Sequence, residues 1–182
     1  MKKFFLLLFV ISLVLNSCSQ DESLDPRPVL VSGQFVKFDI QNKLIDSKNL
    51  ATSTFGGVIS APGNKVASYK VYVRMYNAPN PATDFKFLRE ITKFPSDMYF
   101  TASDIATALQ IPIADVKESV VLGFYGESFD ENGKRTDFSN LSTVIRANSA
   151  AYKHAFRFNS AVEDLSSFTP TSLDAYSNWV GQ

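Results

Sequence analysis

Residues 66–76, VASYKVYVRMY, decide the fold of this chain. From Tyr69 to Tyr76, mainly apolar side chains alternate with polar or amphipathic ones, so that Val71 and Val73 share one face with Tyr69. Successive side chains of a β-strand point to opposite sides of the sheet, and one buried face of an antiparallel sheet produces this alternation. The pattern therefore predicts a half-buried antiparallel strand.

Shorter apolar stretches separated by turn signals lie on both sides of this strand. We expect further strands at residues 29–31, 34–40, 55–60, 85–91, 98–100, 119–129, 141–146 and 155–158. The most apolar of them, 119–129, is predicted to be central, and Asn132-Gly133 supplies the positive φ values of the hairpin turn that follows it. Residues 41–54 are polar and are predicted to form a loop.

One short helix is expected between the strands. Thr101 and Asp104 have the spacing of a capping box, Ile105 and Leu109 place one apolar stripe on the helix, and Pro112 ends it. Many short strands with a single connector helix are typical of a β-sandwich. The sequence therefore predicts an all-β, antiparallel immunoglobulin-like β-sandwich with one short connector helix over residues 29–158.

The C-terminal residues 159–182 leave two interpretations open. Thr171-Ser172-Leu173-Asp174 could open a short helix that Gly181 closes. Alternatively, residues 173–182 are the first strand of a second, incomplete module that contains the single tryptophan, Trp179. The segment is therefore predicted to be a C-terminal extension or a partial second module.

The N-terminus has the pattern of a secretory signal peptide. Lys2 and Lys3 precede the apolar stretch FFLLLFVISLVL, which is shorter than the ~20 residues that span a bilayer. Leu15, Ser17 and Cys18 then resemble the lipobox of bacterial lipoproteins, in which the cysteine is acylated. We expect residues 1–17 to be a lipoprotein signal peptide; an ordinary cleaved signal and an uncleaved anchor are the alternatives.

Residues 18–28 are predicted to be the lipidated cysteine and a flexible tether. The segment is polar and acidic and contains two prolines, so it cannot bury enough apolar surface to fold. Asp21-Glu22 resembles the acidic export signal of Bacteroidetes lipoproteins, which implies an outer-membrane protein that faces the cell exterior. An ordinary charged linker is the alternative.

The composition excludes some classes of partner and site. Basic and acidic residues balance at 18 each, so no basic surface is expected to bind nucleic acid. Cys18 is the only cysteine, and its acylation leaves no disulfide and no thiolate ligand. The core must then come from packing, to which 7 Tyr and the 13 Phe that follow the predicted signal peptide contribute.

The inventory of catalytic side chains is small, and we expect a non-catalytic protein without cofactor or metal. His154 is the only histidine and is expected to be an ordinary surface or half-buried residue at a strand edge. The sequence contains neither a Gly-x-Ser-x-Gly elbow nor a His-Glu-x-x-His motif. The acids that flank one predicted hairpin are expected to be solvated: Glu127, Asp130, Glu131 and Asp137.

Aromatic side chains are the more informative candidates for binding. Tyr72 and Tyr76 lie on the predicted outer face of the strand at 66–76, with Lys70 and Arg74 beside them. Sugar rings stack on flat aromatic side chains, and their hydroxyl groups bond to neighbouring charged groups. Tyr72, Tyr76, Arg74 and Trp179 are therefore candidate glycan-binding residues, unless the tyrosines pack under a loop or a second sheet.

Several of these segments together resemble one family. The segments are 68–73, Phe94-Pro95 with residues 99–105, 124–127, and Asn132-Gly133. They are similar to surface lipoproteins of Bacteroidetes that are encoded beside starch-utilisation-type (SusC/SusD-like) importers and carry immunoglobulin-like domains. The resemblance implies a membrane-anchored accessory protein that binds glycan or another nutrient, with importer components as partners. A structural or adhesive surface protein that binds another protein is the alternative.

Overall fold

The computed structural model describes residues 34–63, 65–76 and 84–167. Cys18, Trp179, the predicted strand at 29–31, the signal peptide, the tether and most of the C-terminal extension lie outside the described residues. The strands are β1 (Lys37–Asn42), β2 (Ile45–Asp46), β3 (Thr54–Ser60), β4 (Ser68–Met75), β5 (Lys86–Ile91), β6 (Ser96–Thr101), β7 (Val120–Phe129), β8 (Arg135–Thr136) and β9 (Arg157–Glu163). The α-helices are α2 (Ala102–Leu109), α3 (Thr143–Ala147) and α4 (Ser149–Tyr152), and the 3₁₀ helices are η2 (Ile113–Asp115), η3 (Phe138–Asn140) and η4 (Leu165–Ser167).

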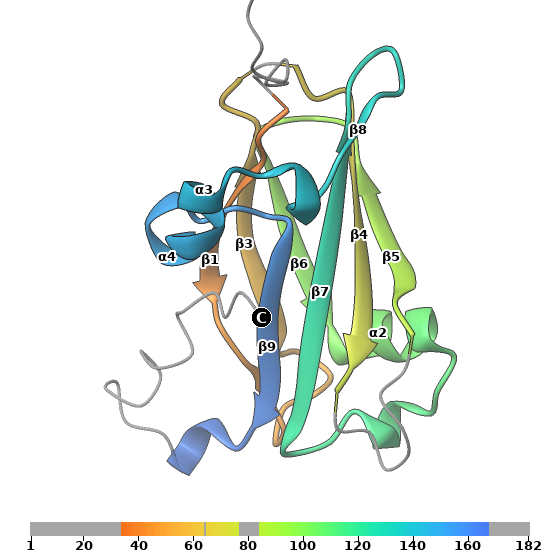
Figure 1. The fold of residues 1–182 in the computed structure, drawn as a ribbon. Coiled ribbons are helices and arrows are strands. Elements are labelled where there is room, and N and C mark those ends of the chain that lie inside the picture. Colours follow the sequence, from red (N-terminus) through yellow and green to blue (C-terminus); the bar gives the residue numbers. More distant parts are fainter. Residues whose placement is uncertain (1–33, 64, 77–83, 168–182) are drawn as a thin grey trace, which may run out of the picture. The chain divides into compact units, whose positions relative to one another are not determined.

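The strands form two sheets that pack as two layers (Figure 1). The smaller sheet has the order β1-β3-β6, and the larger has the order β2-β9-β7-β4-β5, with β8 paired to β7. All pairs are antiparallel except β2 with β9. The prediction of an all-β, sandwich-like fold is confirmed, and its immunoglobulin-like character stays a prediction.

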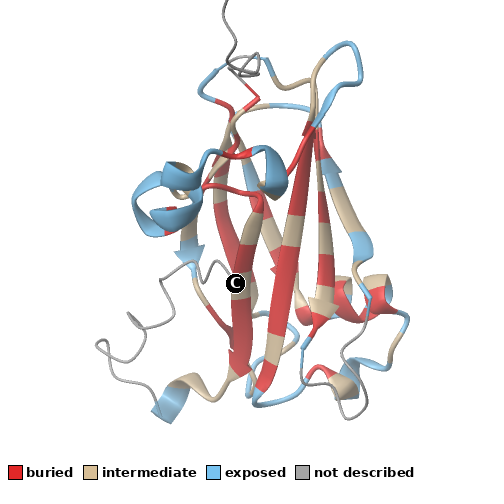
Figure 2. Ribbon diagram, viewed as in Figure 1, coloured by how far each residue is buried: buried red, intermediate tan, exposed pale blue. Residues whose placement is uncertain are grey.

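The central strands of the larger sheet follow the sequence pattern closely. In β4 the buried residues are Tyr69, Val71, Val73 and Met75, and every residue between them is half-buried. Figure 2 shows this alternation along the strand. β7 lies between β4 and β9, as expected for the most apolar segment of the chain. The predicted strand at 66–76 and the predicted central strand at 119–129 are therefore confirmed.

Phenylalanine rings fill the space between the two sheets. Phe124 is central: its ring centroid lies 4.9 Å from that of Phe55 and 5.0 Å from that of Phe158, which is nearly parallel to it. Phe38 and Phe100 extend the cluster, with centroids 5.1 Å from Phe158 and 5.8 Å from Phe124. All five side chains are fully buried, so aromatic packing provides the centre of the core.

The predicted helix cap and hairpin turn are present. The Thr101 side chain accepts a hydrogen bond from the Asp104 amide at 3.1 Å, and the Asp104 carboxylate accepts one from the Thr101 amide at 2.9 Å. This capping box begins α2. In the turn after β7, the positive φ is found at Gly133 alone, not at Asn132, and the Gly133 amide bonds to the Asp130 carbonyl.

Three predictions about the second half of the chain and the first loop were wrong. Residues 143–147 form helix α3 rather than a strand, because the Ser142 side chain caps the amide of Ile145 and the β-branched Val144 faces solvent. The described residues therefore contain two α-helices, α3 and α4, in addition to the predicted connector helix α2. The predicted strand at 155–158 is shifted, since β9 extends past the predicted domain end at 158 as far as Glu163. The predicted loop 41–54 contains the short strand β2.

The described residues form short helices, of which α2, with 8 residues, is the longest. None of their helices has the length and apolar character that crossing a membrane requires.

Candidate functional site

Three of the predicted binding residues, Tyr72, Arg74 and Tyr76, lie on the outer face of the six-stranded sheet, that is, the face turned away from β1, β3 and β6. Tyr72 and Arg74 are half-buried residues of β4, and Tyr76 directly follows β4 with 36% of its surface exposed. Tyr72 and Arg74 alternate with the core residues of β4 that Figure 2 shows as buried. Trp179 and Cys18 lie outside the described residues, so the structure brings together Tyr72, Arg74 and Tyr76 only.

One row of side chains crosses the outer face at the level of Tyr72. Tyr72 is opposite Phe87 of β5 and Tyr125 of β7, and Tyr125 is opposite Arg157 of β9. The Tyr72 ring lies 5.9 Å from that of Phe87 and 6.2 Å from that of Tyr125, at interplanar angles of 75° and 47°. Phe87 packs edge-on against Tyr72 and Tyr125 is tilted to it, so the three rings do not form one flat platform. Phe87 is the most exposed of them, at 51%.

A second group of side chains lies around Arg74. Its guanidinium carbon lies 4.2 Å from the ring centroid of Tyr76 and 4.6 Å from that of Phe85. Arg74 is opposite Gly123 of β7, and a Cβ atom on Gly123 would lie 2.4 Å from the Tyr76 ring. The absence of a side chain at this position lets the Tyr76 ring fold over the sheet.

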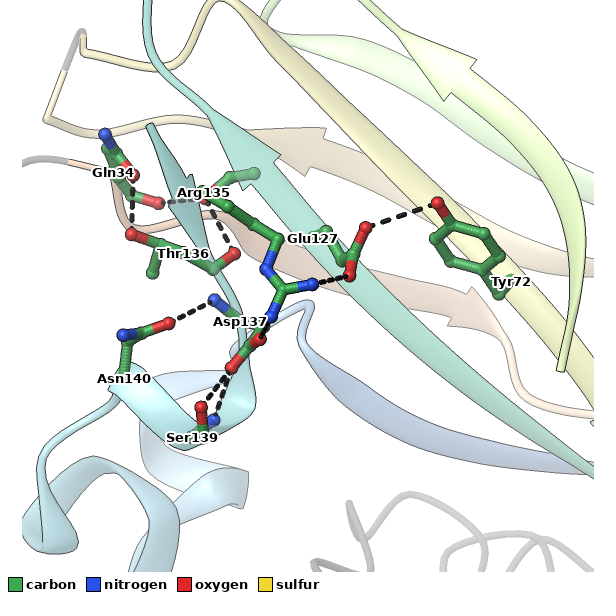
Figure 3. Close-up of polar contacts among 9 residues, drawn as sticks. Gln34, Tyr72, Glu127, Arg135, Thr136, Asp137, Ser139 and Asn140 are labelled. Atoms are coloured by element: carbon green, nitrogen blue, oxygen red, sulfur yellow. Dashed lines mark hydrogen bonds and ion pairs between the residues drawn. The ribbon is translucent and has the colours of Figure 1, made fainter. Parts of the chain in front are cut away.

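A polar network joins the aromatic row to the hairpin after β7 (Figure 3). The Tyr72 hydroxyl donates to the carboxylate of Glu127 at 3.2 Å. Arg135 of β8 connects two acids, with N–O distances of 3.1 Å to Glu127 and 2.9 Å to Asp137. Asp137 also accepts a hydrogen bond from the Ser139 amide at 2.8 Å. Tyrosine, carboxylate and guanidinium groups are thus linked on one surface.

The network holds its groups in defined protonation states. Burial raises the pKa of Asp137, but hydrogen bonds from Ser139 and Tyr125 and the charge of Arg135 outweigh burial, so the pKa is lower than usual. Burial, followed by the neighbouring Asp137 carboxylate, raises the pKa of Tyr125. Burial and the Glu127 carboxylate likewise raise the pKa of Tyr72. Both tyrosines therefore stay protonated and act as hydrogen-bond donors.

The sequence interpretation found part of this surface and missed the rest. Phe85, Phe87 and Tyr125 were not predicted as site residues, because only the strand register places Phe87 and Tyr125 beside Tyr72, and only the folded chain brings Phe85 to Arg74. Glu127 and Asp137 were expected to be solvated, but they are 9% and 4% exposed. That prediction was wrong because Arg135 and the tyrosine hydroxyls compensate their charges, which allows burial.

The prediction for His154 was also wrong, since its side chain is fully buried. Its Nε2 lies 3.0 Å from the Ser149 hydroxyl, which itself donates to the Arg146 carbonyl, so Nε2 is the donor. Nδ1 accepts a hydrogen bond from the Phe156 amide at 3.4 Å. Burial lowers the pKa of His154 to about 4. This neutral histidine is oriented as a core residue, not as a base toward Ser149.

The remaining acids of the hairpin have local partners. The Asp130 carboxylate accepts hydrogen bonds from the amides of Asn132 at 2.9 Å and Lys134 at 2.8 Å, which stabilises the turn. Within the part of the chain that the structure describes, no group of three His, Cys, Asp or Glu side chains is arranged to hold a metal ion.

Comparison of the chain with protein-family models, with curated proteins and with solved structures found no match in any of the three.

Proposed function

We propose that this protein is a non-catalytic lipoprotein of the outer membrane that binds a glycan on the outer face of its larger sheet, beside a nutrient importer. The observation that carries the proposal is the row of Phe87, Tyr72 and Tyr125, which lies on an accessible sheet face and ends in a charged network. Acylation of Cys18 would hold the protein at the membrane, facing the cell exterior.

The outer face offers both kinds of contact that a sugar requires. Exposed ring surface at Phe87 and Tyr76 provides apolar contact for the C–H face of a sugar. Arg135 is 57% exposed along its side chain and is held by Glu127 and Asp137, so it is an ordered donor that remains partly open to solvent. Ordered polar groups beside apolar contact surface are characteristic of small-molecule binding sites.

A lipid anchor gives such a binding surface a simple role. A tethered domain raises the local concentration of its ligand near the membrane without any chemical step. Glycan held in this way is available to neighbouring importer components, which the resemblance to SusC/SusD-associated lipoproteins suggests as partners.

A second candidate function is binding to another protein, and the observation that favours it is the edge of the larger sheet. β5 is the last strand on its side of that sheet and pairs only with β4 among the described strands. An edge strand presents unpaired backbone groups to which an extended segment of a partner can add. Phe87 lies on this strand and is exposed. A structural or adhesive role would use this edge.

Affinity electrophoresis of the full-length chain, purified in mild detergent, against a panel of neutral and acidic polysaccharides tests the proposal. We expect retention by at least one polymer, and we expect Phe87→Ala and Tyr76→Ala each to weaken it by roughly 3- to 10-fold, because each removes an exposed ring worth about 0.5–1.5 kcal/mol. Tyr152→Ala is the matched control, since Tyr152 is 41% exposed but lies on α4. Absence of retention by every polymer, together with co-purification of a protein partner, would select the second candidate.

A further inference from the structure

Arg74 differs in its partners from Arg135 of the outer face and from Arg89 at the adjoining edge. Arg135 contacts two carboxylates, and Arg89 lies 3.6 Å from that of Asp104. Arg74 contacts two aromatic rings, but it has no ion-pair partner among residues 34–63, 65–76 and 84–167, and its buried Nε has no hydrogen-bond partner there. It is a half-buried cation without a counter-ion in the described structure.

The energetics of this arrangement favour an anionic ligand. Partial burial of an unpaired charge is unfavourable, and contact with Tyr76 and Phe85 offsets part of that cost. An arginine held against ring faces keeps its in-plane N–H donors available, and their fork geometry matches a carboxylate. The rings therefore orient Arg74 for an acceptor that the described chain does not supply.

A second unpartnered polar atom lies in the same cross-strand row. Arg74 is opposite Gly123, and Gly123 is opposite Asn159 of β9. The buried Asn159 Oδ1 has no hydrogen-bond partner among the described residues. Gly123 contributes no side chain between the two residues, and the Tyr76 ring occupies the space over it. The row thus contains one unused donor and one unused acceptor, both buried, so a ligand with an anionic group and a hydroxyl group reaches them only when the side chains that cover them move.

We infer that Arg74 binds the carboxylate of an acidic sugar residue, so that the glycan taken by the outer face is a uronic-acid-containing polymer. The inference rests on the proposed glycan-binding function and specifies its substrate class. The exposed ring of Tyr76 beside Arg74 favours a sugar over an acidic peptide, because it offers apolar stacking surface next to the charge.

The test compares polymers that differ only in charge. Polygalacturonate, alginate and hyaluronan are each compared with their methyl-esterified forms by affinity electrophoresis and calorimetry, using the full-length chain in mild detergent. We expect at least one polyuronate to bind and its esterification to weaken binding by roughly 10-fold or more, since a hydrogen bond to a charged group contributes about 1.5–3 kcal/mol. Added salt should weaken binding of the acidic form more than that of the ester.

Variants then assign the effect to Arg74. Arg74→Gln should weaken binding of the polyuronate by about 10- to 100-fold and leave binding of the ester nearly unchanged. Arg74→Lys should give an intermediate loss, because it keeps the charge but not the fork. Lys70→Gln is the matched control: it removes a cation from the same strand and face, where Lys70 lies over the Phe129 ring, and should change affinity less than about 2-fold. Thermal unfolding of each variant checks that the fold is retained.

Three outcomes would overturn the inference, and they are distinguishable. Equal affinity for acidic and esterified polymers, unchanged by Arg74→Gln, would exclude the carboxylate contact and leave glycan binding intact. Binding of poly-glutamate but of no polysaccharide, lost in Arg74→Gln, would assign Arg74 to an acidic protein partner. Failure to bind any neutral or acidic polymer would overturn the proposed function and this inference together.

Discussion

The inner and outer faces of the six-stranded sheet are both aromatic, but they differ in what surrounds the rings. On the inner face, Phe124 and Phe158 are fully buried and stack on other phenylalanines. On the outer face, Tyr72 and Tyr125 are half-buried, and their hydroxyl groups belong to a network with Glu127 and Asp137. The comparison teaches that the same strands serve stability on one side and present chemical groups on the other.

The sharpest way to break this comparison is to remove one ring from each face. Phe124→Ala should lower the free energy of unfolding by about 3–5 kcal/mol, because it leaves a cavity between Phe55 and Phe158. Phe87→Ala should lower it by less than about 1 kcal/mol, because that ring is 51% exposed. Urea unfolding followed by circular dichroism measures both values.

If Phe124→Ala does not fold, Phe124→Leu replaces it, with an expected loss of about 1.5 kcal/mol or less. Similar losses for a substitution at Phe124 and for Phe87→Ala would show that the outer face also belongs to the core.

The buried interior should also differ from the outer face in its response to acid. We expect the free energy of unfolding to depend on pH, and we attribute this dependence to the buried His154. Its folded pKa is about 4 and its unfolded value is near 6.5, so between these values the unfolded chain binds more protons than the native one. The free energy of unfolding should therefore fall as the pH decreases from about 6.5 to about 4, by up to about 3 kcal/mol. Urea titrations at pH 7.5, 6 and 5 measure this slope.

The control for this prediction is His154→Gln, which keeps a polar group near Ser149 but does not titrate. Its unfolding free energy should be nearly constant over the same pH range, whatever its value at pH 7.5. A wild-type slope that persists in His154→Gln would place the titrating group elsewhere.

The smallest expected effects on stability come from alanine substitutions at two glycines of β7 that face opposite sides of the sheet. At Gly126 a Cβ would lie 2.2 Å from the Tyr69 hydroxyl and 2.4 Å from the Ala155 carbonyl, so Gly126→Ala should cost about 1–3 kcal/mol. At Gly123 the nearest atoms all belong to the Tyr76 ring, which can rotate into solvent, so Gly123→Ala should change stability by about 0.5 kcal/mol or less. Thermal unfolding measures the two variants side by side.

Gly123→Ala also bears on ligand binding, since it displaces Tyr76 from Arg74. A loss of stability as large as that of Gly126→Ala would contradict the view that the outer ring is free to move.

Features encoded over a few neighbouring residues were predictable from the sequence. The alternation along β4, the Thr101–Asp104 cap and the turn before Gly133 each depend on local periodicity or on a side chain that bonds to a nearby amide. The same reasoning failed at residues 141–146, where β-branched residues favoured a strand but the Ser142 cap began a helix.

The sequence by itself determined the all-β class, the central strands and the outward placement of Tyr72, Arg74 and Tyr76. Only the tertiary structure decided which groups meet on that face, because Tyr72 and Glu127 are brought together by the β4–β7 register and not by proximity in the chain. It also decided the burial of Glu127, Asp137 and His154, since burial of a polar group depends on partners that distant segments supply. Periodicity is a local property, whereas compensation of charge is a property of the assembled fold.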